Sequence, residues 1–484
     1  MIINFIFVFI FSFLVRLLFI ILYPETGGDY DIYSTVAKNI LRGCGVSLSE
    51  PLSGLCIPHF GGNHGPGYDA FIALVWYLFD GSNLAVRVTQ TLIYSSLCVY
   101  LLYAVQKQIS SKKLLLFFAF LLSFSPLLIA WPRYVQTETL SIALTLFIIA
   151  ELLLSLSSKK VRILQISLAL ILATWIRLDS IFLTIPVAVC CFYIHGFKKG
   201  FTNGLAIALL LSSSWGLWTL RNITVNLPSL LPTNMIMPDG SRSPVGYLSW
   251  TKTWITNEYE KPGSLWGVNR KNYNNIFIPD YAYFDEKEKK SVKNLITQLK
   301  LFSGMDFPED IDNEFEVLAN NKKNAYPVKY WLENPVKRIY KMWSNPYSSF
   351  GWPNEIPSHG LSHSERLFAA KGNYNILILK IKNYPFKAIS KGINAFYKYV
   401  LLALFIYSIF FIFKNSKNKL IKYFAYISLS YIFVRTIFFS VNGMFETRYL
   451  VTVIPFMEIF VLFCFFDRFY KRIDIVSLKS KPGK

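Results

Sequence analysis

Long apolar runs alternate with short polar gaps along most of the chain. A helix of about 20 apolar residues crosses the roughly 30 Å hydrocarbon core of a membrane. We predict about ten such spans. They lie near residues 3–23, 84–105, 114–131, 138–156, 163–177, 180–195, 201–219, 396–413, 423–440 and 449–466. This pattern predicts a polytopic α-helical membrane protein.

Two long polar segments interrupt these runs. Residues 24–83 form a first loop, in which the stretch YDAFIALVWYLF is typical of a helix lying in the membrane interface. Residues 220–395 are rich in Asn, Tyr, Pro and Lys and are long enough for a compact domain. The predicted parts are a transmembrane module with its first outer loop, an extracytoplasmic domain, C-terminal transmembrane helices and a basic cytoplasmic tail. Their ranges are 1–219, 220–395, 396–466 and 467–484.

The basic residues indicate the orientation of the spans. Only 16% of the 484 residues are charged, against about 25% in soluble domains, yet the net charge is +21. Lysine and arginine cluster in short gaps and in the tail, which the positive-inside rule assigns to the cytoplasm together with both termini. The charge is therefore explained by topology, and we expect no nucleic-acid partner. The first segment has no basic leader or small-residue cleavage site, so we expect it to be retained as a span.

This orientation collects charged residues of both signs on the extracytoplasmic side. They are Asp29, Asp31, His59, His64, Arg133, Glu138, Arg177, Asp179, Arg221, Glu446 and Arg448. Ionisable groups close to lipid are costly and tend to be functional. The pattern predicts a polar cavity that opens to the outer surface.

The stretch GGDYDIYSTVAKNI, directly after the first span, resembles the start of the first outer loop of GT-C-fold glycosyltransferases. The matching residues are Asp29, Tyr33, Ala37, Gly43 and Gly45. A Gly-Pro-Gly-Tyr turn at 65–68 follows where the family commonly has Pro-Pro-Gly-Tyr. Glycine and proline also mark ordinary turns, so this second motif alone is weak.

Later motifs follow in the family's order. Thr137 and Glu138 open a span, RLD at 177–179 stands where the family has an Arg-Pro-Asp-like corner, and MFETRYLVTVIPF precedes the last span. The chain is similar to the protein-mannosyltransferase and aminoarabinose-transferase-like group, which includes O-antigen-modifying glucosyltransferases. The resemblance covers residues 1–222 and 396–466 and is fragmentary between them.

The resemblance implies a GT-C-like fold and an inverting membrane glycosyltransferase. It would move a hexose or pentose from a polyprenyl-phosphate sugar to an extracytoplasmic acceptor, such as O-antigen, lipopolysaccharide or another surface glycan. The implied location is a bacterial inner membrane, with the active site facing the periplasm. Membrane lipids, the lipid-linked donor, a donor synthase and a flippase would be partners. We expect no firmly bound cofactor, and dependence on a divalent metal stays open.

The resemblance also implies roles for individual residues. Asp29 would be the catalytic base, because a carboxylate can take the proton of an acceptor hydroxyl. Arg448 would hold the departing phosphate, with Arg133 and Arg177 as second candidates, because guanidinium matches phosphate oxygens. The residues expected to orient substrates are Asp31, Glu138, Glu446, Tyr33 and Tyr449.

Other interpretations stay open at this point. A lipid-linked sugar flippase or transporter would place charges near the middle of the membrane, where Glu151 and Glu458 are the clear acids. A glycan polymerase or ligase is a second alternative. His59 and His64 lack a clear third metal ligand. Cys44 and Cys56 lie on the oxidising side and can form a disulfide.

Overall fold

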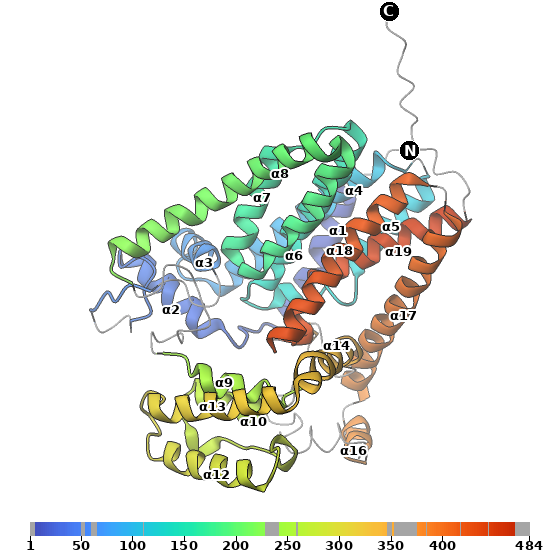
Figure 1. The fold of residues 1–484 in the computed structure, drawn as a ribbon. Helices are drawn as coiled ribbons and strands as arrows, with labels where there is room; N and C mark the ends of the chain where they lie inside the picture. Colours follow the sequence, from blue (N-terminus) through green and yellow to red (C-terminus); the bar gives the residue numbers. More distant parts are fainter. Residues whose placement is uncertain are drawn as a thin grey trace, which may run out of the picture.

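The structure is a computed structural model, and its described residues are mostly helical. It describes residues 5–49, 54–59, 65–109, 111–227, 242–257, 260–345, 351–352, 375–383, 385–416, 418–443 and 445–469. These residues contain no β-strand, and their single isolated bridge joins Ser47 to Pro58. Figure 1 shows a large helical bundle with a smaller helical domain at one end.

Within the described residues, six helical segments are long and apolar enough to cross a membrane. They are α1 (Phe5–Leu22), α4 (Asn83–Gln106), α6 (Glu138–Ser158), η3 (Leu178–Leu183) with α8 (Thr184–Thr224), the Lys391–Lys414 part of α17 (Pro385–Asn415) and α18 (Lys419–Asn442). Shorter helices α5 (Lys112–Phe124), α7 (Ile163–Ile176) and α19 (Ile454–Phe469) accompany them. Gly196 breaks α8 with a φ of +69°, a left-handed backbone that glycine tolerates. Each predicted span thus corresponds to a helix or to half of α8, which confirms the polytopic helical class.

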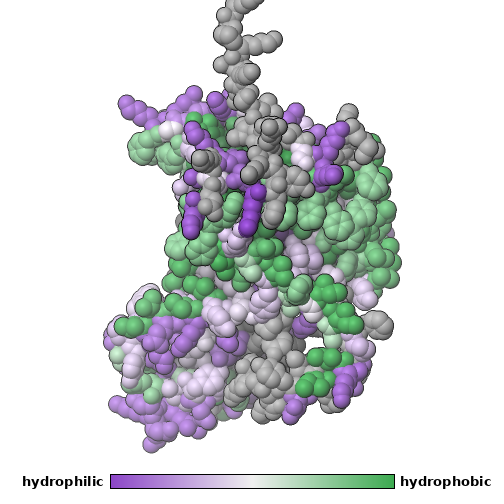
Figure 2. All heavy atoms as spheres, turned by 90° about the vertical axis from the view of Figure 1, so that its right-hand side faces the viewer, coloured by the Kyte–Doolittle hydropathy of each residue, from purple (hydrophilic) through white to green (hydrophobic). Residues whose placement is uncertain are grey.

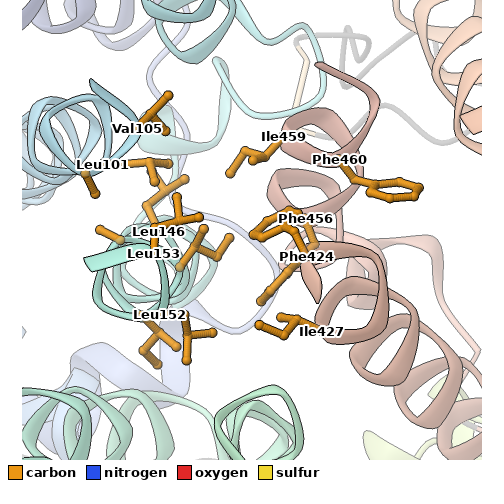
Figure 3. Packing of buried hydrophobic residues seen from close by; sticks show 14 of the residues in the cluster. Leu101, Val105, Leu146, Leu152, Leu153, Phe424, Ile427, Phe456, Ile459 and Phe460 are labelled. Carbon is orange, nitrogen blue, oxygen red and sulfur yellow. The ribbon is translucent and has the colours of Figure 1, made fainter. Parts of the chain in front are cut away.

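The core of the bundle forms around α6. Of its apolar window, 78% is buried, as expected of a helix that is apolar on all sides. Figure 3 shows Leu146 and Leu153 of α6 between Leu101 of α4 and the aromatic rings of Phe424 and Phe456. The outer surface of the bundle is also apolar, and Figure 2 shows this as a green belt between hydrophilic regions. An apolar interior with an apolar perimeter is suited to a lipid environment.

The first outer loop contains two short helices, α2 (Tyr30–Leu41) and α3 (Gly67–Leu78). The turn before α3 packs against the end of α7, where a Cβ on Gly65 would lie 2.3 Å from the carbonyl oxygen of Trp175. Glycine at this position is therefore a steric requirement. A disulfide joins Cys44 to Cys56, with Cα atoms 5.1 Å apart.

The smaller domain, called here the outer domain, comprises the described residues 242–345. Its helices are α9 (Val245–Thr251), α10 (Lys261–Ser264), α11 (Trp266–Asn269), α12 (Glu286–Lys300), α13 (Glu309–Ala325), a π-helical turn (Lys329–Glu333) and α14 (Asn334–Ser344), with 3-10 turns at Tyr273–Asn275 and Asp280–Ala282. Trp250 and Phe315 lie in its core, which continues onto Phe439 of α18 and onto Phe445 and Leu450 beyond it. A shared core fixes the outer domain against the end of α18. Another short helix, α16 (Asn375–Asn383), precedes α17.

Candidate active site

Asp29 stands at the N-terminal end of α2. Its side chain does not cap that helix, although this is the usual role of aspartate at the position. Instead its Oδ2 lies 3.0 Å from Nη1 of Arg448, which is 419 residues away in the sequence. The side chains of Asp29 and Arg448 are 40% and 34% exposed, so the pair is open to solvent and to a substrate.

The ion pair continues into the outer domain. Arg448 belongs to the 3-10 turn η8 (Thr447–Leu450), and its Nε lies 2.7 Å from Oε2 of Glu446. The other oxygen of Glu446 accepts from Nζ of Lys261 at 3.3 Å. Lys261 lies in α10 and is largely buried. The site thus joins three parts of the chain: the first loop, the loop before α19 and the outer domain.

This arrangement keeps Glu446 and Arg448 charged. Burial alone would raise the pKa of Glu446, but Arg448 and Lys261 outweigh it and lower the pKa to about 2. Glu446 in turn raises the pKa of Arg448 well above its ordinary value, with Asp29 adding to the effect. Arg448 therefore remains a cation over the whole physiological pH range, as a phosphate ligand requires.

Two tyrosines border the pair. Tyr33 of α2 is buried and packs edge-on against Tyr68, with ring centroids 5.0 Å apart. Burial raises its pKa well above the ordinary value, and the charges of Asp29 and Glu138 raise it further. Burial and the neighbouring Glu446 raise the pKa of Tyr449 to about 12. Both phenols are therefore neutral and can donate hydrogen bonds.

A second charged network lies deeper in the bundle. Arg177 binds Glu138 at 2.9 Å and Asp179 at 3.0 Å, and Arg435 of α18 binds the same carboxylate of Asp179 at 2.7 Å. The side chain of Arg435 is fully buried. The two networks meet at Tyr449, because the guanidinium groups of Arg177 and Arg448 lie 5.6 and 5.5 Å from its ring centroid.

Arg133 occupies a different position. It is buried, its Nε donates to the carbonyl of Gly351 at 2.7 Å, and its Nη1 donates to the carbonyl of Tyr23 at 3.0 Å. Its Nη2 donates to the hydroxyl of Tyr134. Three guanidinium nitrogens thus already have protein partners, and a phosphate would have to compete with them. Arg133 as a second phosphate ligand stays a prediction.

The remaining predicted residues are Asp31, His59 and His64. Asp31 is exposed in the first turn of α2, and among the described residues no ion pair involves it. The carbonyl of His59 accepts from Arg221 at 2.7 Å. His64 lies outside the described residues. Within the part of the chain that the structure describes, no group of three or more His, Cys, Asp or Glu side chains is placed to hold a metal.

Sequence reasoning missed Lys261 and Arg435. Arg435 interrupts the apolar run YIFVRTIFF, and a charge inside a span is a signal that could have identified it. Lys261 gave no comparable signal, because it is one of many lysines in a polar domain. Only the packing of that domain brings it to Glu446.

Comparison with known proteins supports the resemblance seen in the sequence. Residues 63–218 match the family model described as dolichyl-phosphate-mannose-protein mannosyltransferase, which covers less than half of the chain. No curated protein and no solved structure gave a significant match. The matched segment begins just before α3 and ends within α8, so it contains Glu138, Arg133 and Arg177. The match, together with the helical bundle, supports a GT-C-fold membrane glycosyltransferase, without defining its subgroup.

Proposed function

We propose that the protein transfers a sugar, with inversion at the anomeric carbon, from a polyprenyl-phosphate donor to a hydroxyl group of an extracytoplasmic glycan. The observation that carries the proposal is the half-exposed pair of Asp29 and Arg448, 3.0 Å apart beyond the ends of the membrane spans. One partner can take a proton and the other can bind a phosphate. These are the two groups that this reaction needs.

The proposed reaction is a single displacement. Asp29 takes the proton of the acceptor hydroxyl as the acceptor oxygen forms a bond to the anomeric carbon. The bond from that carbon to the phosphate oxygen breaks, and the electron pair leaves with the polyprenyl phosphate. Arg448 stabilises the negative charge that develops on the phosphate.

Glu446 and Lys261 support this role by their position. The carboxylate of Glu446 lies between the two cations and pairs with the guanidinium group of Arg448. Arg177, which pairs with Glu138, also lies near the ring of Tyr449, and this pair can bind sugar hydroxyls. An O-antigen or another lipopolysaccharide glycan is the proposed acceptor, on the basis of the family resemblance.

Purified protein in lipid vesicles tests the proposal. Synthetic polyprenyl-phosphate hexoses are supplied with glycans extracted from the source membrane, and product mass and anomeric configuration are determined by mass spectrometry and NMR. We expect one added sugar of inverted configuration and stoichiometric release of polyprenyl phosphate. Transfer that requires a nucleotide sugar, or movement of the lipid-linked sugar across the bilayer without transfer, would contradict it.

A further inference from the structure

The surface of α14 and the π-helical turn before it carries an unusual row of apolar side chains. Val328, Leu332, Val336 and Tyr340 are each more than half exposed. Their spacing of four residues puts them on one side of the helix. Trp331, also mostly exposed, lies beside the row. We call these five side chains the apolar row.

Charged side chains form a parallel row one position further along. They are Lys329, Glu333, Lys337 and Lys341, all exposed. The opposite side of the helix is buried: Asn334 donates to the carbonyl of Thr253 at 2.7 Å, and Arg338 is 1% exposed. One side of α14 therefore packs on the protein, and the apolar row on the other side faces away from it.

The contacts of α14 with the bundle indicate how close this helix lies to the membrane-spanning segments. The carbonyls of Ser344 and Asn345 accept from Tyr399 at 2.7 Å and from Lys398 at 2.9 Å. Both donors lie in the apolar Lys391–Lys414 segment of α17. The C-terminal end of α14 is thus level with residues inside a membrane span.

A contact with a second span, α18, places α14 at the same level. Nη1 of Arg338 donates to the carbonyl of Ser440 at 3.0 Å, and α18 ends two residues later at Asn442. Figure 1 shows α14 at the junction of the bundle and the outer domain. The apolar row therefore lies where the outer leaflet begins.

We propose that this surface is a lipid-binding face, with the apolar row in the outer leaflet and the lysines against anionic headgroups. Moving exposed large apolar side chains out of water and into lipid is favourable. Trp331 and Tyr340 are of the type enriched at membrane interfaces. Three lysines against one glutamate in the charged row suit negatively charged phosphates.

A cavity of about 220 Å³ opens beside the apolar row and extends the lipid-binding face. It is lined by Thr253, Tyr283, Phe284, Lys322, Tyr326, Lys329 and Tyr330. Lys322 is paired with Glu288 at 3.2 Å, so Lys329 is the exposed cation of this lining. Tyr326, Lys329 and Tyr330 lie in the same stretch of chain as Val328 and Trp331 of the apolar row. A lipid whose chains lie along the row would therefore bring its phosphate to the cavity.

Spin labels measure the depth of the apolar row directly. The free cysteines Cys98, Cys190, Cys191 and Cys464 are buried, so a nitroxide reagent would label an added surface cysteine selectively. Leu332→Cys reports on the row, and Val317→Cys, equally exposed on α13 of the same domain, is the matched control. In vesicles of phosphatidylcholine and phosphatidylglycerol, we expect oxygen to relax the Leu332 label several-fold more than a water-soluble nickel chelate does. The Val317 label should show the reverse preference, and equal behaviour of the two labels would overturn the proposal.

Lipid retention tests the cavity. Native mass spectrometry of the full-length protein from the same vesicles would count bound phosphatidylglycerol. We expect Lys329→Gln to retain several-fold less of this lipid than Lys300→Gln, which removes an exposed lysine of α12. Equal retention by the two variants would reject the headgroup site. The depth of the apolar row would still be judged from the spin labels alone. Neither measurement depends on sugar transfer.

Discussion

Arg448 lies between two carboxylates, those of Asp29 and Glu446, at distances of 3.0 and 2.7 Å. Glu446 also binds Lys261, which leaves Asp29 as the more exposed of the two acids. The guanidinium group of Arg448 can turn toward a phosphate while it stays paired with Glu446. Glu446 would therefore act as a positioning residue for Arg448.

Replacing Glu446 by glutamine should therefore impair transfer without abolishing folding. We expect a loss of about 100-fold in kcat, because an arginine displaced by about 1 Å no longer matches the departing phosphate. Sugar transfer and thermal unfolding would be measured in the same vesicles. Glu309→Gln, which breaks the exposed pair with Arg242, is the control and should transfer normally. Wild-type activity in Glu446→Gln would remove this residue from the site.

The lowered pKa of Glu446 gives a pH dependence of stability with a defined sign. Its pKa is about 2 in the fold, against 4.5 ordinarily. The stabilising contribution is therefore complete above about pH 4.5 and is lost as the pH falls toward 2. The difference in Tm between wild type and Glu446→Gln should be constant from pH 8 to 5 and shrink below pH 4.5. A difference that grows on acidification would contradict the assigned charge state.

At the scale of the helices, the network of Asp179 with two arginines holds η3 and α18 together. Arg435 also donates to the carbonyl of Tyr449 at 2.8 Å, so α18 positions the loop that carries Arg448. Arg435→Met should destabilise the protein by about 3 kcal/mol, because the largely buried carboxylate of Asp179 loses one of its two arginine partners. Arg242→Met, which removes the arginine of an exposed pair, should cost less than about 1 kcal/mol. Unfolding of both variants in detergent would provide the comparison.

At the scale of the whole molecule, the spans could be read from the sequence, because membrane thickness leaves few choices for their length. The first-loop motif marked Asp29, and the last motif marked Glu446 and Arg448. Their contact could not be read in this way, since it depends on how α2 and η8 pack across the bundle. The pairing of Lys261 with Glu446 could not be predicted for the same reason, because it forms only when the outer domain packs against α18.

The most direct test of the central claim compares Asp29 with Asp310, an exposed aspartate in the first turn of α13. Asp29→Asn removes the proposed base but keeps its shape, whereas Asp310→Asn neutralises an acid outside the proposed site. Transfer from a polyprenyl-phosphate sugar would be measured for both variants, with membrane insertion and Tm as checks on folding. Loss of a general base should reduce the rate at least about 100-fold in Asp29→Asn, with Asp310→Asn near wild type. Equal activity of the two variants would show that Asp29 is not the base.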